Sequence, residues 1–392
     1  MSNTASTRPG FLVRLREGGP RAILMQLALV AAVVGALVYL VVNARAALQA
    51  QGMTSGFGFL TQATSFSMGE GYFNFTPSDS YLRAFAAAIG NTIVISAVSI
   101  LTASALGALI GVAALARNPI LRGVAQSYVY LFRNTPQLLQ IIFWYSFFAL
   151  LPPVRDAWSL GFGIFASNRG LTLPAPENGS VLTLMLIVLV AAFGVSTLVM
   201  RKLRERVDLA MSPRSLGLLR AAMVLGPVLI VWLAAGAPRG WSVPELGRFN
   251  YTGGATLAPE FMALYFGLSF YIAAFIAEIV RGGVQSVDAG QIEAARTVGL
   301  SEGQIMVRVV APQALRIIIP PLAAQYISLL KNSSLGVAVG YPELFSVANT
   351  SLTYSGRTIE VLVLMAGTYL LISLCVGLGA AFINRLTQYP SR

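Results

Sequence analysis

Long apolar stretches separated by short polar ones dominate the chain. A helix that spans a bilayer needs about 20 mostly apolar residues, and the third stretch is shorter than that. This short stretch continues from the apolar segment 124–132. The two are separated at Thr135-Pro136, where proline removes a backbone donor and breaks a helix. The pattern predicts an all-α, polytopic membrane protein with about eight transmembrane helices. We place them at 22–42, 85–115, 137–151, 181–200, 219–237, 260–280, 317–340 and 359–383.

Basic residues gather on alternate loops and set the expected orientation. Loops rich in Lys and Arg stay on the cytoplasmic side of a membrane. Seven of the 27 Lys and Arg residues lie in the intervening loops, and Lys331 lies within a span. We therefore expect both termini to face the cytoplasm, and 52–80 and 161–180 to be external loops. The other nineteen basic residues lie in 1–21, 116–136, 201–220, 281–316 and 384–392.

The composition agrees with a membrane protein and excludes several kinds of catalytic and metal site. The chain is 56% hydrophobic and 11% charged, whereas soluble domains carry about 25% charged residues. The net charge of +12 is explained by the membrane orientation rather than by nucleic-acid binding. Histidine is absent and Cys375 is the single cysteine, so we expect no histidine base, no His/Cys metal site and no intrachain disulfide. The first span could be a signal peptide, but its apolar core of about 20 residues exceeds a signal's 7–15 and favours a retained anchor.

The loop 281–316 is patterned more regularly than a simple connection requires. Asp288 can cap a helix over 289–298, and Gly299 can end it in the left-handed conformation. Ser301 with Gln304 forms a capping box for a second helix, and Pro312 and Pro320-Pro321 end or kink the segment beyond it. Ala294 and Ala295 leave one face of the first helix without bulk. The pattern predicts two short helices joined by a sharp turn.

Two functions are open for this pair of helices. An amphipathic hairpin could lie on lipid headgroups, but Asp288, Glu293 and Glu302 outnumber Arg296, and an acidic segment suits an anionic membrane surface poorly. We therefore favour a projection that docks into a partner protein.

Four ordered motifs give the chain a family resemblance. Glu293-Ala294-Ala295, then Gly299 and Val309-x-Ala311-Pro312, resemble the EAA loop of ABC importer permeases, with Val309 and Ala311 in place of the usual Ile and Leu. The segments 277–283, 133–140 and 329–336 resemble the polar amino-acid branch of these permeases, nearest to the larger permeases of general L-amino acid importers.

The resemblance implies a type I importer (MetI-like) core with an extra N-terminal helix and an inserted helix pair. Its parts would be 1–84 (N-terminus, first span and external loop), 85–385 (permease domain with the insertion 181–237) and 386–392 (tail). It implies a bacterial inner-membrane subunit, not itself an enzyme, that carries polar or general L-amino acids. Its partners would be ATPase subunits that hold ATP and Mg²⁺, a periplasmic binding protein, and a second permease, homologous or identical, with a heterodimer expected. The residues implied in ATPase coupling are Asp288, Gln291, Glu293, Ala294, Ala295, Gly299, Ser301 and Pro312.

Polar residues within the spans are candidates for the solute path, because ionisable groups are costly there. Lys331 could meet a substrate carboxylate, pair with Glu278, or bind a backbone carbonyl. Glu278 and Arg281, three residues apart, are expected to be a structural pair, and Asn91-Thr92 could hydrogen-bond across helices. The candidates for the path are Gln140, Gln325, Ser328, Lys331, Asn332 and Ser333. Arg133, Thr135 and Pro136 are expected at the inner mouth, with Glu278 and Arg281, in structural or gating roles.

Two other classes compete with the importer. An ion-coupled secondary carrier would have inverted repeats and carboxylates in the middle of the membrane, and we find no inverted halves and one internal carboxylate, Glu278. A membrane enzyme would use Lys331 as a base, beside Ser333. The chain carries no G-x-x-x-x-G-K-[ST] segment to bind ATP phosphates.

Overall fold

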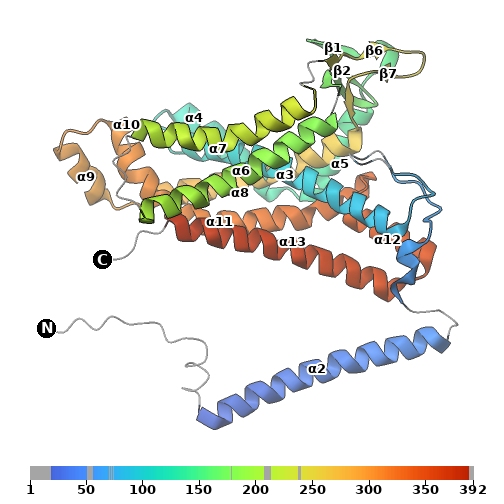
Figure 1. The fold of residues 1–392 in the computed structure, drawn as a ribbon. Helices are drawn as coiled ribbons and strands as arrows, with labels where there is room; N and C mark the ends of the chain where they lie inside the picture. The colour runs from blue at the N-terminus through green and yellow to red at the C-terminus, as the bar shows by residue number, and fades with distance from the viewer. Residues whose placement is uncertain are drawn as a thin grey trace.

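The computed structural model describes residues 19–50, 56–69, 71, 73, 75–177, 179–206, 213–236 and 240–387. Parts of the predicted cytoplasmic segments, namely 1–18, 207–212 and 388–392, lie outside the described residues. Helices make up most of the structure (Figure 1). Their bounds are α2 Gly19–Ala50, α3 Tyr81–Ala113, α4 Pro119–Asn134, α5 Gln137–Ala149, α6 Gly179–Arg206, α7 Pro213–Ala234, α8 Pro259–Gln285, α9 Ala289–Thr297, α10 Glu302–Ile305, α11 Ala311–Asn332, α12 Leu344–Ser355 and α13 Thr358–Thr387.

The helical, membrane-spanning character predicted from the sequence is confirmed. Each predicted span coincides with a helix, and the break at Thr135-Pro136 separates α4 from α5. α5 has 13 residues, too few to cross a bilayer alone. Five helices of the described chain are long and apolar enough to cross by themselves, so the count of eight stays a prediction. These five are Tyr81–Ala113, Ser215–Ala234, Pro259–Gln285, Glu302–Val339 and Thr358–Phe382.

α8 is the central helix, and small residues allow its neighbours to approach it closely. A Cβ on Gly107 of α3 would lie 2.8 Å from the Ala273 carbonyl oxygen, and one on Gly111 would lie 2.7 Å from that of Ala277. Gly107 and Gly111 continue a stripe of small buried residues, with Ser99 and Ala103 at the same four-residue spacing, along which α3 packs closely.

A second contact region holds the loop before α12 against α3. The Asn91 side chain donates to the Pro342 carbonyl at 2.9 Å, and the Leu344 N–H donates to Thr92 Oγ1 at 3.0 Å. The expected hydrogen bonding of Asn91-Thr92 between distant segments is therefore confirmed.

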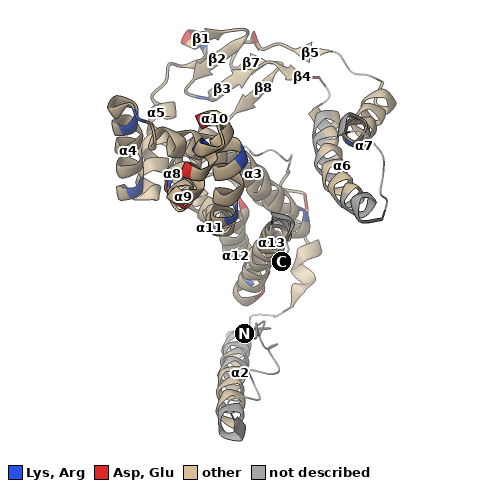
Figure 2. Cartoon of the chain, turned by 90° about the vertical axis from the view of Figure 1, so that its left-hand side faces the viewer, with Lys and Arg blue, Asp and Glu red and all other residues tan. Residues whose placement is uncertain are grey.

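Two parts lie beside this bundle rather than within it. The helices α6 and α7, which we predicted to be an insertion, pack on one another and are set off to one side (Figure 2). α2 is also separate in both views. The last turn of α13 lies at the same end of the bundle as α9 and α10.

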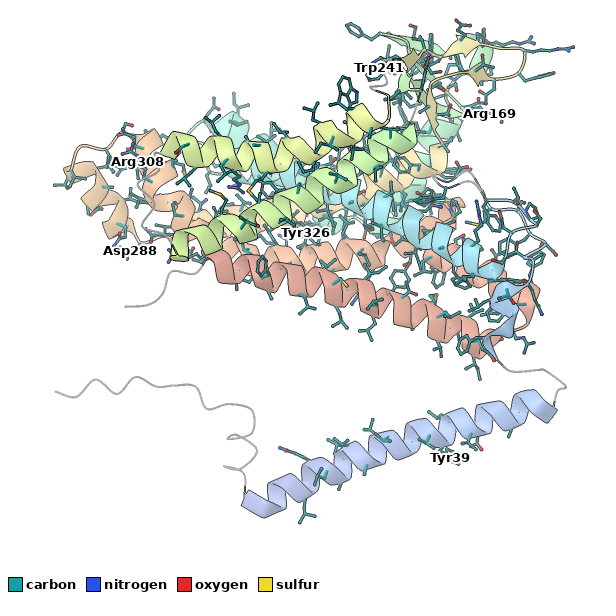
Figure 3. The ribbon with its side chains drawn as sticks, viewed as in Figure 1. Tyr39, Arg169, Trp241, Asp288, Arg308 and Tyr326 are labelled. Atoms are coloured by element: carbon teal, nitrogen blue, oxygen red, sulfur yellow. The ribbon has the colours of Figure 1, made fainter. Side chains whose placement is uncertain are left out.

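The opposite end carries short strands where the sequence predicted loops. We call them the strand cap, residues 158–177 and 240–257. β3 pairs antiparallel with β8, which joins the segment after α5 to the segment before α8, although they are some 80 residues apart. Figure 3 shows Arg169 and Trp241 in this cap and Asp288 and Arg308 at the far end of the bundle. The strands are β1 Trp158–Gly161, β2 Ile164–Ser167, β3 Gly170–Leu173, β4 Ala175–Pro176, β5 Trp241–Ser242, β6 Glu245–Leu246, β7 Tyr251–Thr252 and β8 Ala255–Leu257, in sheets ordered β1-β2-β3-β8, β4-β5 and β6-β7.

Candidate functional site

Two short helices between α8 and α11 form an arm, residues 288–305. The Asp288 carboxylate accepts from the Gly290 N–H at 2.7 Å and caps α9. At the other end, the Gly299 N–H donates to the Arg296 carbonyl (2.9 Å) and the Leu300 N–H to that of Ala295 (3.2 Å). This is a Schellman motif, and Gly299 takes the left-handed φ of +81° that the motif requires. The predicted cap and helix end are confirmed.

The second helix of the arm is fixed to the first by side chains. The Ser301 N–H donates to Gln304 Oε1 (3.0 Å), and the Gln304 N–H donates to Ser301 Oγ (3.4 Å), which confirms the capping box. Arg296 Nε donates to Glu302 Oε1 at 2.9 Å across the turn, and this hydrogen bond raises the pKa of Arg296. Arg117, between α3 and α4, approaches Glu302 at 4.0 Å. The arm is therefore a rigid unit that also contacts the loop after α3.

The two alanines of the arm face different ways. Ala295 is buried in a cluster with Ile305 and Val310, where it joins α9 to the rest of its own chain. Ala294 is exposed. The two alanines therefore do not share one face as expected, because consecutive residues of a helix lie about 100° apart. The face open to a partner instead carries Gln291, Glu293, Ala294, Thr297 and Val298, the last 75% exposed.

Pro312 lies in the first turn of α11 and does not end the helix. A π-helical turn, Met306–Val310, precedes it and connects α10 to α11. Such a turn absorbs a residue whose backbone cannot donate the regular hydrogen bond. Pro320 and Pro321 likewise lie inside α11. The arm therefore passes directly into a helix that enters the bundle.

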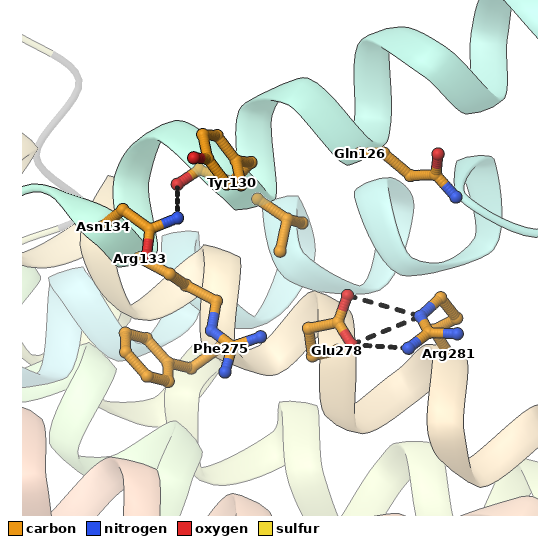
Figure 4. Close-up of a pocket in the computed structure, with 8 residues that line it drawn as sticks. Gln126, Tyr130, Arg133, Asn134, Phe275, Glu278 and Arg281 are labelled. Carbon is orange, nitrogen blue, oxygen red and sulfur yellow. Dashed lines mark hydrogen bonds and ion pairs between the residues drawn. The ribbon is translucent and has the colours of Figure 1, made fainter.

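A polar cavity of about 560 Å³ lies between α4 and α8, at the arm end of the bundle (Figure 4). The Arg133 guanidinium stacks over Phe275 at 5.1 Å. Arg281 Nη2 donates to Glu278 Oε2 at 2.7 Å, so the expected pair is confirmed and Glu278 is not paired with Lys331. Arg133, Glu278 and Arg281 thus line one cavity. Pro136, which precedes α5, lies at the adjoining helix break.

Gln140 supports this helix break and is 7% exposed. Its side-chain nitrogen donates to the carbonyls of Phe132 (3.0 Å) and Thr135 (3.1 Å). Both are carbonyls that the break leaves without helical partners. The geometry therefore gives Gln140 a structural role at the helix break, and its place along the solute path stays a prediction.

The remaining polar residues expected along the path lie near the end of α11. Asn332 donates to Gln137 Oε1 of α5 at 2.7 Å, and the buried Ser333 hydroxyl donates to the Leu330 carbonyl at 2.7 Å. Gln325 and Ser328 are half-buried on α11.

Lys331 lies in the last turn of α11 and is exposed. It lines a cavity of about 410 Å³ between α11 and α13. Within the described part of the chain no hydrogen bond or ion pair holds its ammonium group. The other lining residues are Ser334, Phe345, Met365, Ala366, Tyr369, Leu370 and Ser373.

Sequence reasoning missed a buried carboxylate at Glu343. Its oxygens accept from the N–H groups of Phe345 (2.8 Å) and Ser346 (2.6 Å), and the Tyr369 hydroxyl donates to it at 2.9 Å. Glu278 is therefore not the single internal carboxylate. A carboxylate just before an apolar helix is a cap signal, but the predicted spans leave Glu343 in an external loop.

The described residues contain no group of three His, Cys, Asp or Glu side chains that could hold a metal ion. What the structure contains instead is a helical membrane bundle with a rigid arm at one end and polar cavities beside its helices. These features are those of a membrane transport subunit.

Comparison with known proteins assigns the family. Residues 216–389 match the family described as "binding-protein-dependent transport system inner membrane component". The general L-amino acid transport system permease protein AapQ of Rhizobium johnstonii is 38% identical over 93% of this chain and 91% of its own length. YhdX of Escherichia coli, described as a putative amino-acid ABC transporter permease, is 40% identical over 98% of both chains. A crystal structure of an amino acid ABC transporter with histidines is 19% identical, with a TM-score of 0.46 over 78% of this chain and 94% of that chain. The chain belongs to the family of permease components of binding-protein-dependent ABC transport systems.

Proposed function

We propose that this chain is the permease subunit of an ATP-driven importer that moves polar or general L-amino acids into the cytoplasm. The names of its relatives supply the solute class. ATP and Mg²⁺ would be held by a separate ATPase, and this chain would perform no chemistry of its own. A periplasmic binding protein would deliver the solute.

The observation that carries the proposal is the arm. Two capped helices, a Schellman turn and an ion pair between Arg296 and Glu302 make it rigid. A rigid element transfers displacement to α8 and α11, whereas a flexible loop would absorb it. Gln291, Glu293 and Ala294 form the contact surface for the ATPase, and Ala295 transmits force into the bundle because it is buried there.

Lys331 is the residue we place in the solute path. Its ammonium group is unpaired among the described residues and lines a cavity with Ser334 and Tyr369. A carboxylate is the complementary group on an amino acid, and an ammonium–carboxylate hydrogen bond is among the stronger kinds. Arg133, with the Glu278–Arg281 pair, would act at the inner mouth.

The assembly and orientation belong to the same proposal. A second permease would complete the path in a heterodimer, in the bacterial inner membrane. Both termini would face the cytoplasm, on the side of the arm. The position of the last turn of α13 beside the arm supports this orientation.

Reconstitution tests the proposal directly. The chain is placed in liposomes with its ATPase, second permease and binding protein, and uptake of labelled L-glutamate or L-glutamine is measured with and without ATP. Uptake that depends on ATP and on all four components is the expected result. Uptake by this chain alone, driven by an ion gradient, would instead establish a secondary carrier.

A matched pair of variants tests the role of the arm. Val298→Asp places a charge on the arm face, and Phe249→Asp does so at a similarly exposed apolar residue of the strand cap. Val298→Asp should lose co-purification with the ATPase, and Phe249→Asp should keep it. Equal retention by both variants would remove the arm from the ATPase interface.

A further inference from the structure

The hairpin of β1 and β2 in the strand cap presents an apolar edge with nothing folded against it. The pairing of β1 with β2 is irregular between Ser159 and Gly161, which leaves Leu160 without a partner residue in β2. All four residues of β1 are exposed. Trp158 is 54%, Leu160 59% and the turn residue Phe162 97% exposed.

The turn of this hairpin carries an aromatic residue where the backbone disfavours one. Phe162 and Gly163 both have positive φ, +52° and +75°. This is the two-residue hairpin turn that normally takes Asn, Asp or Gly at both positions. A phenylalanine there is strained, and it gains no packing inside the chain, since it is 97% exposed. Strain of this kind is retained where the residue serves a purpose.

The surroundings indicate what contacts the hairpin. Residues 157–168 contain no Asp, Glu, Lys or Arg. In Figure 1 the hairpin lies to one side of the bundle at its outer end, and in Figure 2 it lies on the α5 side of the strand cap, away from α6 and α7. The chain enters the hairpin from α5, whose exposed apolar stripe continues towards it. That stripe consists of Leu139, Phe143, Phe147 and Leu150.

We propose that the β1–β2 hairpin inserts into the interfacial layer of the bilayer, with Trp158, Leu160 and Phe162 among the lipids. Aromatic side chains favour this layer. Because the hairpin is uncharged, zwitterionic lipids suffice and no anionic headgroup is needed. The proposal rests on the chain spanning a membrane, and not on which solute it carries.

The neighbouring β6–β7 hairpin provides an internal comparison. Its turn also exposes a phenylalanine, Phe249, at 80%. Charged residues flank that ring, Glu245 in β6 and Arg248 stacked over Phe249 at 5.4 Å. We expect this second hairpin to remain in water.

Site-specific labelling tests the assignment in the full chain. Cys375 is replaced by Ala to remove the native thiol, and a cysteine at position 162 or 249 carries an environment-sensitive fluorophore. The protein is placed in phosphatidylcholine nanodiscs with and without nitroxide-labelled lipid. The label at 162 should emit at shorter wavelength, lose intensity to lipid nitroxide and resist iodide. The label at 249 should emit at longer wavelength, keep its intensity with lipid nitroxide and be quenched by iodide.

A second pair of variants keeps the turn intact while it removes the ring. Asn suits the positive φ at 162, so Phe162→Asn preserves the fold, and a label at position 160 then reports the depth of the hairpin. Its quenching by lipid nitroxide should fall with Phe162→Asn and stay unchanged with Phe249→Asn. A label at 162 that iodide quenches as strongly as the label at 249 overturns the proposal. So does protection that arises only when binding protein is added, which would assign the hairpin to a protein contact.

Discussion

Replacement of Gly299 by valine is the sharpest test of how the arm works. Gly299 has φ of +81°, and a Cβ there would meet no atom within 4 Å. Steric overlap is thus absent, and the cost is the backbone strain alone. A residue with a Cβ pays about 1–2 kcal/mol in this region, and a β-branched one is a clear outlier there.

That strain weakens the turn rather than the bundle. A backbone strain of about 1–2 kcal/mol lowers the ratio of the formed to the unformed turn by a factor of about 5–30. The Schellman bonds of Gly299 and Leu300 and the Arg296–Glu302 pair would open together, since all three span the same turn. If the formed turn is what the ATPase binds, its affinity for the permease falls by up to the same factor.

The assay measures binding of the purified ATPase to the reconstituted permease, together with ATP-dependent uptake. Gly299→Asn is the matched control, because asparagine tolerates the left-handed region. We expect the valine variant to insert normally, bind the ATPase less tightly and lose uptake, with the asparagine variant near wild type. Equal behaviour of the two variants would refute the argument that the conformation of the turn transmits the motion.

Three other parts of the structure carry predictions of their own. Lys331→Gln should lower uptake about tenfold or more, the value of one hydrogen bond to a charged group, with ATPase binding retained; unchanged uptake would remove Lys331 from the path. Gly107→Leu should lower the thermal inactivation midpoint, since its Cβ would lie 2.8 Å from the Ala273 carbonyl oxygen and overpacking costs about 1–3 kcal/mol. Gly123→Ala, in open space, is the control, and equal midpoints would contradict the close packing of α3 on α8. Hydrogen bonds from the Thr76 N–H and hydroxyl, with Arg83, hold the pKa of Asp79 below its usual value. A lowered pKa stabilises the folded state at pH values above the ordinary pKa, and this stability is lost as the pH falls through the lowered value. The protection of the amides of 75–80 against hydrogen exchange should therefore decrease below about pH 4. Asp79→Asn should abolish this dependence, and an equal rise in the variant would assign the effect to another group.

Local chemistry was predictable from the sequence, whereas the long-range partners of individual side chains were not. The caps at Asp288 and Ser301 and the end at Gly299 depend on neighbours within a few residues, so spacing alone revealed them. The structural role of Gln140 was not predicted, because its partners are the free carbonyls of a helix break. Ala294 and Ala295 were treated as one face although helical geometry separates them.

The strand cap was missed for a different reason. Its strands are two to four residues long, too short for an alternating pattern to stand out. The pairing of β3 with β8 also joins segments separated by the whole inserted helix pair. Glu343 escaped notice because its burial depends on Tyr369, a residue of another helix.

The inserted helix pair enters and leaves the molecule at one point. Ala175 pairs with Ser242 and Pro176 with Trp241, and the Glu177 N–H donates to the Gly240 carbonyl at 3.1 Å. The backbone on either side of α6 and α7 is therefore already joined as it would be across a short turn. Two helices added at such a junction change neither the course of the chain into α8 nor the side of the membrane on which the arm emerges. We therefore expect that a short turn in place of the pair would leave the path of the backbone into α8 unchanged.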